Sequence, residues 1–457
     1  MTRDEAVAIW KLPEEEAVEI ILRLAEKAEK YDHQEAPLGP TTPSGMTPPY
    51  LKPASSRKRK PPGRKKGHLG LSRLRPEAID HVKEHQLSQC PVCQGPVNQS
   101  IQAYKRTIED IPPIEKPEET EHTVNGYWCS RCKKIVFSTV TDALPNAQIG
   151  LRLVVFSAWL HYLVGVSIQN IVKILSVVCR FPVSAGGLTL AWKNLAFLLE
   201  PCYQHIGQKI SQSGVLNADE TGWRLNGITH WLWCFTTPTL CYYLITKSRG
   251  SPVVKEVLGV LFKGILICDF WGAYNKLSAL AKQRCFYHLF TELIKVDKKK
   301  DSPAWKAFRK KLSRLLKDAI RLADRKPKLE SSRYARLKAH LYQRLNQLLV
   351  APQKDTDAYR LIKRLRRHQN ELFTFLEHEG VSPYNNHAEQ QMRKPVLTRK
   401  VSQQNRSAQG AKTQAILMSL FRTAELQGQN PIEILLVNAK MALNPQPQTG
   451  QPLKLAA

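Results

Sequence analysis

The amino-acid sequence predicts an α/β fold, with a mixed β-sheet that carries helices on both faces and a separate helical insertion. Two observations lead to this prediction. Short apolar runs rich in β-branched and aromatic residues recur between Val215 and His288. Between Asp301 and Glu379 the sequence instead has long, charged helical patterns such as WKAFRKKLSRLLKDAIRLADRK, with few strand signals.

The sheet region predicts its elements one by one. Val215 to Ala218 is an apolar run that leads into Asp219, and HWLWCFTT and LCYYLITK then read as two further strands of an antiparallel group. We expect a helix around Pro252 to Leu261, a short buried strand from Ile265 to Cys268 that ends at Asp269, and another strand from Arg284 to His288.

The charge of the chain points to an anionic partner. The 457 residues include 68 Lys and Arg against 39 Asp and Glu, a formal net charge of +29. Such an excess repels itself unless an anion shares the surface, and nucleic acid is the usual partner. An anionic membrane is the alternative, but no anchor is evident in the sequence.

Neither the start of the chain nor its longest uncharged stretch argues for secretion or a membrane span. MTRDEAVAIWKLPEEEAVEI has acids and no apolar signal core, and ten Cys without a signal indicate reduced cytosolic thiols. Leu153 to Val172 has no formal charge over twenty residues, which is long enough to cross a bilayer. Because it contains His161, Gln169 and Asn170, we interpret it as a buried helix.

The N-terminal part predicts a helix and a basic linker. Glu14 to Tyr31 has helical spacing, typical either of a short coiled coil with a second copy or of an ordinary amphipathic helix. Ala36 to Pro62 holds eight prolines and cannot form a packed core. The overlapping block RKRKPPGRKK predicts phosphate contacts, with a solvated charge run as the alternative. Its basic residues are Arg57, Lys58, Arg59, Lys60, Arg64, Lys65 and Lys66.

Two CxxC pairs predict a structural zinc site. Cys90 and Cys93 form the first pair, Cys129 and Cys132 the second, and thirty-five residues separate them. Four thiolates make a closed tetrahedral Zn²⁺ site, although the gap requires a loop between the pairs. Redox chemistry at a single CxxC is the alternative. The other six Cys lie in largely apolar surroundings, as core residues do.

Two carboxylates predict a metal site in the sheet. Asp219 and Asp269 each follow an apolar strand-like run, so we expect each at a strand end where side chains converge. Such a pair can bridge Mg²⁺, and with a third carboxylate two ions can act on a phosphate. A turn or cap is the alternative for either residue alone. Chain order does not choose the third carboxylate from among 39 acids.

From Arg59 to about Leu436 the chain resembles a transposase of the IS66 family. The resemblance begins at KPPGRKKGHLG and the double CxxC, and it is sharpest in NADETGWRLNG, CDFWGAYNKL and NNHAEQQMRKP. A run from Arg399 to Pro431 follows in the same order. The resemblance implies an RNase H-like core, with Asp219, Asp269 and Glu389 as catalytic residues that bind two Mg²⁺ (or Mn²⁺) ions.

The resemblance also implies a substrate and a reaction. Transposon-end and target double-stranded DNA would be cut by hydrolysis and joined by transesterification. Arg393 follows Glu389 by one helical turn and could meet the scissile phosphate, unless it is a surface salt-bridge partner. Arg399 and Lys400 begin the basic run that follows and are further predicted DNA contacts.

Partners follow from the same resemblance. It implies a bacterial, cytoplasmic, nucleoid-associated protein without a membrane, acting as a homodimer or larger with accessory proteins of its element.

The resemblance, with the composition, divides the chain as follows: N-terminal helix (1–35), linker (36–85), four-cysteine zinc-binding module (86–140), helical DNA-binding or packing region (141–212), first part of the catalytic core (213–295), helical insertion (296–379), second part of the core (380–442), disordered tail (443–457).

Several points stay open at the level of sequence. Helical segments around SIQNIVKIL and LTLAWKNLAFLL fit either a helix-turn-helix or simple bundle packing. His288 fits a DNA contact, the metal site or the core, and Leu289, Phe290 and Thr291 replace the family's basic residues after it. Four Trp near the acids either stack on bases or belong to the core: Trp223, Trp231, Trp233 and Trp271. An inactive DNA-binding descendant and an RNase H-like nuclease or resolvase are the competing functions.

Overall fold

The structure is a computed structural model that describes residues 13, 15–18, 22, 78–97, 104–108, 116–402 and 404–444. Three of the sequence predictions fall outside these residues. They are the basic block Arg57 to Lys66, most of the N-terminal helix, and the tail from residue 445 onward.

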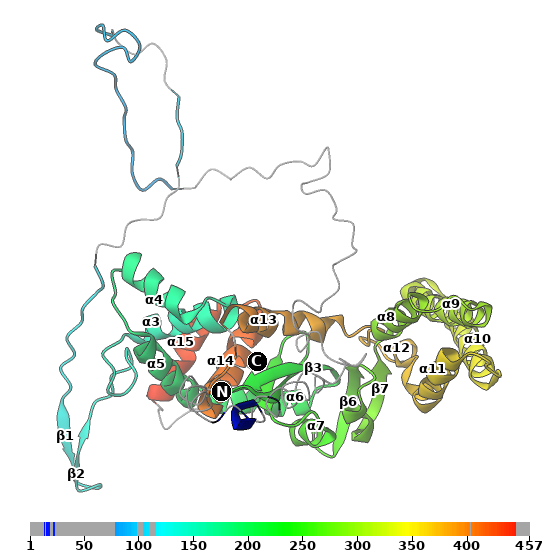
Figure 1. Ribbon diagram of the computed structural model, residues 1–457. Coiled ribbons are helices and arrows are strands. Elements are labelled where there is room, and N and C mark those ends of the chain that lie inside the picture. The colour runs from blue at the N-terminus through cyan, green and yellow to red at the C-terminus, as the bar shows by residue number, and fades with distance from the viewer. Residues whose placement is uncertain are drawn as a thin grey trace.

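A five-stranded mixed sheet forms the centre of the fold, as the sequence predicts (Figure 1). Its strands run in the order β5-β4-β3-β6-β7. The three strands β3, β4 and β5 pair antiparallel, whereas β6 pairs parallel with both β3 and β7. The bounds are β3 (Val215–Leu225), β4 (Ile228–Thr236), β5 (Cys241–Thr246), β6 (Leu261–Cys268) and β7 (Ser278–Arg284).

The strand predicted from Arg284 to His288 is wrong. The last strand, β7, ends at Arg284, and helix α8 (Phe286–Asp297) begins two residues later. The sequence SALAKQR conceals β7 because it forms one edge of the sheet, so several of its side chains are polar or exposed. The apolar residues that follow serve the helix instead, since Phe286, Leu289 and Leu293 are buried at helical spacing.

Helices from both ends of the described chain cover the sheet and share one hydrophobic core with it. Helix α14 also protects the free edge of β5, because Ser419 Oγ and Thr423 Oγ1 accept the backbone N–H groups of Tyr243 and Cys241 at 2.8 and 3.1 Å. The bounds are α3 (Leu151–Trp159), α4 (Ile168–Val177), α5 (Ala185–Leu198), α6 (Glu200–Ser211), α7 (Ser251–Leu258), α13 (Asn386–Ser402), α14 (Ala408–Leu426) and α15 (Pro431–Leu443).

The single buried helix predicted from Leu153 to Val172 is wrong in one respect, because the chain breaks inside it. Helix α3 passes into a π-helical turn that stops at Gly165, whose φ of 91° few other residues adopt. Ser167 then caps α4 by accepting the N–H of Asn170. Within the described residues, every helix is too short or too polar to cross a membrane.

Helix α5 is held in the helical layer through one of its faces. It packs against α3 and α14, and its Trp192 is fully buried. The Trp192 indole donates a 3.0 Å hydrogen bond to Ser157 Oγ in α3. A helix of a helix-turn-helix also packs through one face, so both alternatives stay predictions.

A second hydrophobic cluster joins Ile265 and Ile267 of β6 to helices between Asp269 and Glu389, which Figure 1 shows beyond β7. Three long helices fall within the segment whose charged patterns predict helix. They turn leucines and aromatic residues inward and leave their charged faces outside. Their bounds, with the short helix that follows, are α9 (Pro303–Arg325), α10 (Ser331–Val350), α11 (Thr356–Arg367) and α12 (Thr374–Glu377).

Gly264 in β6 allows the parallel strands to approach closely. A Cβ at this position would lie 2.1 Å from the carbonyl oxygen of Ser213 and 2.9 Å from that of Gly214. We expect Gly264→Ala to lower the free energy of unfolding by roughly 1–3 kcal/mol, because backbone would have to move. Urea denaturation measures the change. Gly214→Ala, whose Cβ would meet nothing within 4 Å, is the control, and equal stability of the two variants would contradict this reading.

Candidate metal and nucleic-acid site

Asp219 and Asp269 lie at the same level of neighbouring parallel strands. The last paired residues of β3 and β6 are Asn217 and Ile267, and each aspartate comes two residues later. Side chains two apart along a strand point to the same face, so both aspartates continue the face defined by that pair. The pairing of β3 with β6 therefore brings the two carboxylates together.

The strand-end prediction holds for Asp269 but not for Asp219. Asp269 directly follows β6, whereas β3 continues past Asp219 to Leu225. The continuation pairs only with β4, where Asp219 lies opposite Cys234. The sequence conceals this because DETGW is polar and contains Gly222, although it forms a regular antiparallel ladder. Asp219 thus lies just beyond the last residue of β3 that pairs with β6. From there on, β3 has no strand of the described chain beside it on the β6 side.

Asn385 fixes the start of α13 against β3. Its side chain is fully buried, donates to the carbonyl oxygen of Ala218 at 2.8 Å, and accepts from Asn217 Nδ2 at 2.9 Å. Its backbone N–H also donates to Cys285 Sγ at 3.2 Å. These bonds position the first turn of α13, which carries Glu389, beside Asp219.

Two more residues of the NNHAEQQ motif hold α13 in place. His387 Nε2 lies 2.7 Å from the carbonyl oxygen of Thr237, at the end of β4. Gln391 Oε1 accepts from Arg422 Nε in α14 at 2.6 Å, and its carbonyl oxygen accepts from the Tyr243 hydroxyl at 2.8 Å. The motif therefore anchors α13 on three elements, and Glu389 lies in the first turn of this anchored helix.

The charges of Asp269 and Glu389 act on Asp219, although in the described chain the ligand atoms of the three acids do not all lie within 4.8 Å of one another. Burial raises the pKa of Asp219 well above its usual range, and the charges of Glu220, Asp269 and Glu389 raise it further. Burial also raises the pKa of Glu389, although the charges of His288 and Arg393 oppose this. The negative charges around Asp219 and Glu389 favour a bound cation, which would relieve their repulsion.

Glu220, the neighbour of Asp219, belongs to a separate ion-pair network. Its carboxylate accepts two bonds from Arg249, at 2.9 and 3.1 Å, and a third from the Tyr274 hydroxyl at 2.6 Å. Burial and the charge of Asp269 raise the pKa of Glu220 to about 7, despite these partners. Since it accepts three hydrogen bonds, two of them from Arg249, Glu220 acts as a support for Arg249.

Arg249 in turn orders the tryptophans beside Asp269. Its guanidinium carbon lies 4.2 Å from the Trp231 ring centroid and 3.7 Å from that of Trp271. The Trp271 backbone N–H donates to Asp269 Oδ1 at 2.8 Å, which fixes that carboxylate. Trp223 and Trp233 are fully buried, so the core alternative is correct for these two.

Arg284 supports Asp269 from inside the protein. Its side chain has no exposed surface, and its guanidinium donates to the carbonyl oxygen of Asp269 at 2.7 Å and to Asn275 Oδ1 at 2.8 Å. Glu371, between α11 and α12, neutralises it through a 2.6 Å ion pair. The helical insertion thereby stabilises the loop that holds the second aspartate.

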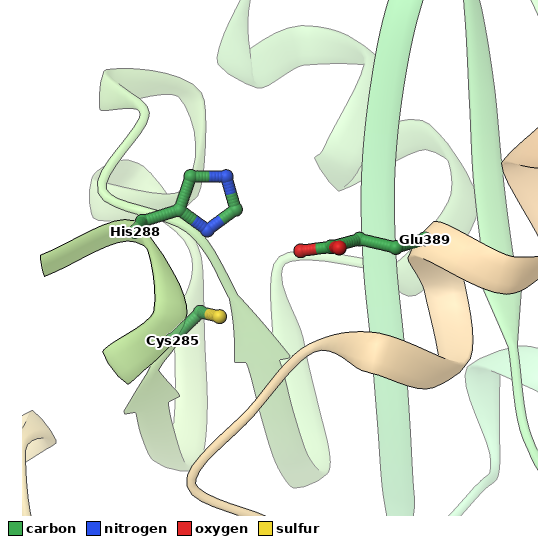
Figure 2. A group of neighbouring side chains, drawn as sticks. All are labelled: Cys285, His288 and Glu389. Atoms are coloured by element: carbon green, nitrogen blue, oxygen red, sulfur yellow. The ribbon is translucent and has the colours of Figure 1, made fainter. Parts of the chain in front are cut away.

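Cys285, His288 and Glu389 form a cluster at the edge of the acidic site. Figure 2 shows the Glu389 carboxylate directed from α13 toward Cys285 and His288 at the start of α8. One ligand atom of each residue lies within 4.8 Å of the other two. His288 thus lies beside Glu389, and the choice among DNA contact, metal site and core stays a prediction.

Each of the two CxxC pairs forms a local turn whose backbone N–H groups favour the thiolate form of its first cysteine. Backbone N–H groups of Cys93 and Val92 lower the pKa of the Cys90 thiol, and those of Cys132 and Arg131 lower the pKa of the Cys129 thiol. The second pair spans a hairpin of β1 (Gly126–Cys129) and β2 (Lys134–Phe137). In the described chain the pairs do not join as one ligand group, and Figure 1 shows residues 78–97 apart from the hairpin. The shared zinc site therefore stays a prediction.

The predicted DNA-binding residues of α13 differ in their surroundings. Arg393 and Lys400 are exposed, and the charge of Arg393 acts on Glu389 as the one-turn spacing suggests. Arg399 is half-buried and donates to the carbonyl oxygen of Gly222 in β3. It therefore ties α13 to the far end of β3, and a DNA contact by Arg399 stays a prediction.

Several residues of the site escaped sequence reasoning. Glu220 and Arg249 are a polar pair whose partners lie on different elements, and Arg284 has no sequence feature that marks it as buried. Asn385 carried a signal, since it belongs to NNHAEQQ, but a motif does not show which member is the anchor. Cys285 also carried one, the CxxH spacing that places it on one helix face with His288.

A comparison with protein families agrees with this geometry. The family model described as "Transposase IS66 family" matches residues 146–413, more than half of the 457 residues. The match includes Asp219, Asp269 and Glu389 and begins after both CxxC pairs. A search of curated proteins finds no match. With its sheet, its acids and this match, the chain belongs to the IS66 family of transposases.

Proposed function

We propose that the protein is a DDE-type transposase that cuts transposon ends and joins them to target DNA, with Asp219, Asp269 and Glu389 as its metal-binding acids. The observation that carries the proposal is that the charges of Asp269, which follows β6, and of Glu389 in α13 act on the buried carboxyl group of Asp219 in β3. The strand order β5-β4-β3-β6-β7, with three antiparallel and two parallel-paired strands, supports an RNase H-like core.

The three acids fit a pair of Mg²⁺ or Mn²⁺ ions. Glu389 Oε1 is buried and makes no hydrogen bond within the described residues, which is costly unless a cation or substrate group meets it. Oxygen ligands are those that both ions prefer. When bound, such ions supply Lewis acidity to the reacting phosphate and nucleophile.

The chain's own residues would position the substrate. Arg393 is exposed one turn from Glu389 and would bind a phosphate oxygen of the scissile strand. Trp271 and Arg249 hold Asp269, so that carboxylate keeps its orientation as DNA enters. Lys400 and the basic block Arg57 to Lys66 would contact the DNA backbone more remotely.

The reaction has two phosphoryl-transfer steps. In the first, a water oxygen bonds to phosphorus at the transposon end, and the bond to the 3′ oxygen breaks, which leaves a 3′-hydroxyl. In the second, that hydroxyl attacks a target phosphodiester and displaces the target's own 3′ oxygen. No side chain becomes bonded to DNA, because water and the DNA hydroxyl are the nucleophiles.

Assembly follows from the chemistry. Joining both ends of an element requires two active sites, so we propose a homodimer or larger assembly, with accessory proteins of the element as further partners. The two CxxC pairs are proposed to share one Zn²⁺, because their thiolates are already favoured by backbone N–H groups. A measured zinc content that falls by one ion per chain in Cys93→Ser and in Cys132→Ser would support this.

The function is tested with DNA from the inverted repeats that flank the gene. The protein, with any companion proteins of its element, is incubated with labelled end DNA and Mg²⁺, and products are resolved by size. We expect cleavage at the repeat end and joined products with target DNA. Binding without either reaction would favour an inactive descendant, and cleavage without joining a nuclease or resolvase.

A further inference from the structure

We propose that Cys285, His288 and Glu389 form a second cation site, selective for a thiol-binding transition-metal ion such as Zn²⁺, that shares Glu389 with the acidic site. The juxtaposition arises from two elements. Cys285 precedes α8 and His288 lies in its first turn, three residues apart, so both face the same side. Glu389 reaches them from the first turn of α13 (Figure 2).

The geometry is close to that of a bound ion. The Sγ, imidazole nitrogen and carboxylate oxygen lie within 4.8 Å of one another. Ligand atoms around a tetrahedral Zn²⁺ are separated by about 3.5 Å, given bonds of about 2.0–2.3 Å. Small rotations of the His288 and Glu389 side chains would close this difference without moving either helix.

Unpartnered atoms point to a missing ligand at this place. His288 Nδ1 and Glu389 Oε1 are both buried, and neither makes a hydrogen bond within the described part of the chain. Each such atom costs free energy unless something binds it. A cation between the two would satisfy both atoms at once, and the Cys285 sulfur lies beside them.

The ligand atoms of this site differ in kind from those of the acidic site. Asp219, Asp269 and Glu389 offer oxygen only, whereas Cys285 and His288 add sulfur and nitrogen, which Mg²⁺ does not favour. Three protein ligands leave a fourth position of a tetrahedral ion open to water or to a phosphate oxygen of DNA.

Under the proposed function, the sharing of Glu389 would make the two metal sites compete and would affect DNA cleavage. A thiol-binding ion would draw the Glu389 carboxylate toward α8 and away from Asp219 and Asp269. The two sites would then compete for one ligand. We expect low Zn²⁺ to inhibit strand cleavage supported by Mg²⁺, and removal of the Cys285 sulfur to relieve the inhibition.

Binding is tested by titration of the full-length, metal-stripped protein with Co²⁺, whose thiolate complexes absorb in the near ultraviolet. The four CxxC cysteines contribute equally to every variant compared. We expect Cys285→Ser and His288→Ala to lose one equivalent of tightly bound Co²⁺, and Cys285→Ser to lose part of the thiolate absorption. Cys202→Ser, which removes a buried Cys in α6, is the matched control and should titrate like wild type.

The outcomes decide the proposal independently of catalysis. Wild-type stoichiometry in both Cys285→Ser and His288→Ala would overturn the site. Because His288 is only half-buried, His288→Ala remains informative if Cys285→Ser does not fold. Relief of Zn²⁺ inhibition in Cys285→Ser supports the sharing of Glu389, and equal inhibition in all variants contradicts it. If no variant cleaves DNA, the proposed function fails while the Co²⁺ titration still decides binding.

Discussion

Replacing Asp269 by Asn is expected to lower DNA strand cleavage about a thousandfold or more while the fold stays intact. Loss of a metal-binding carboxylate removes several kcal/mol of charge stabilisation, and about 1.4 kcal/mol corresponds to a factor of ten in rate. The fold should survive, because the side-chain oxygen of Asn can still accept the Trp271 N–H, now 2.8 Å from Asp269 Oδ1. Initial rates on labelled end DNA with Mg²⁺ measure the effect.

Asp301→Asn is the matched control for this variant. Asp301 precedes α9, its side chain is 83% exposed, and it forms an ion pair with Lys306 at the surface. Its cleavage rate should stay within about twofold of wild type, since surface pairs contribute little. Cleavage by Asp269→Asn at a rate near that of the control would remove Asp269 from the metal site.

Glu371→Gln is expected to lower the free energy of unfolding by about 3–5 kcal/mol at neutral pH. In the wild type, Glu371 Oε2 lies 2.6 Å from Nε of the fully buried Arg284. The substitution removes this negative charge, and an unpaired buried guanidinium is strongly destabilising. The same guanidinium holds the carbonyl oxygen of Asp269, so DNA cleavage should fall as well. Urea denaturation at pH 7 measures stability.

The pH dependence gives this prediction a second readout. Burial alone would raise the pKa of Glu371, but the His368 hydrogen bond and the charge of Arg284 lower it from 4.5 to about 2. A pKa below the unfolded value adds stability that is fully present above about pH 4.5 and lost as pH falls toward 2. Wild type should therefore lose its advantage over Glu371→Gln across that range.

Glu433→Gln serves as the control for stability. Glu433 pairs with Arg152 at the surface, where the two side chains are 48% and 72% exposed. Its loss should cost no more than about 1 kcal/mol. If Glu371→Gln proves as stable as this control at pH 7, then the ion pair with Arg284 does not stabilise the Asp269 loop.

The sequence predicted those parts of the fold that depend on local pattern. The apolar run ILIC marks β6 and places Asp269 directly after it, and the aromatic runs mark β4 and β5. Two errors have local causes as well. β7 is a partly polar edge strand, and Gly165 breaks a stretch whose composition alone suggests one helix.

The site was less predictable because its contacts join distant segments. Glu389 follows Asp269 by 120 residues and lies on a helix, so neither a strand pattern nor the spacing identifies it as the third acid. Only the family resemblance identified it. Asn385 and Arg284 are polar residues that become buried through partners on other elements. Burial of that kind is decided by tertiary packing, which leaves no periodic signal in the sequence.

The central claim is that Asp219, Asp269 and Glu389 together hold divalent cations. Binding of Mn²⁺ to the full-length protein, measured by calorimetry with wild type and Asp269→Asn, tests it most directly. We expect wild type to bind Mn²⁺ and Asp269→Asn to lose that binding, while Asp301→Asn binds as wild type does. Unchanged Mn²⁺ affinity and stoichiometry in folded Asp269→Asn would contradict the claim.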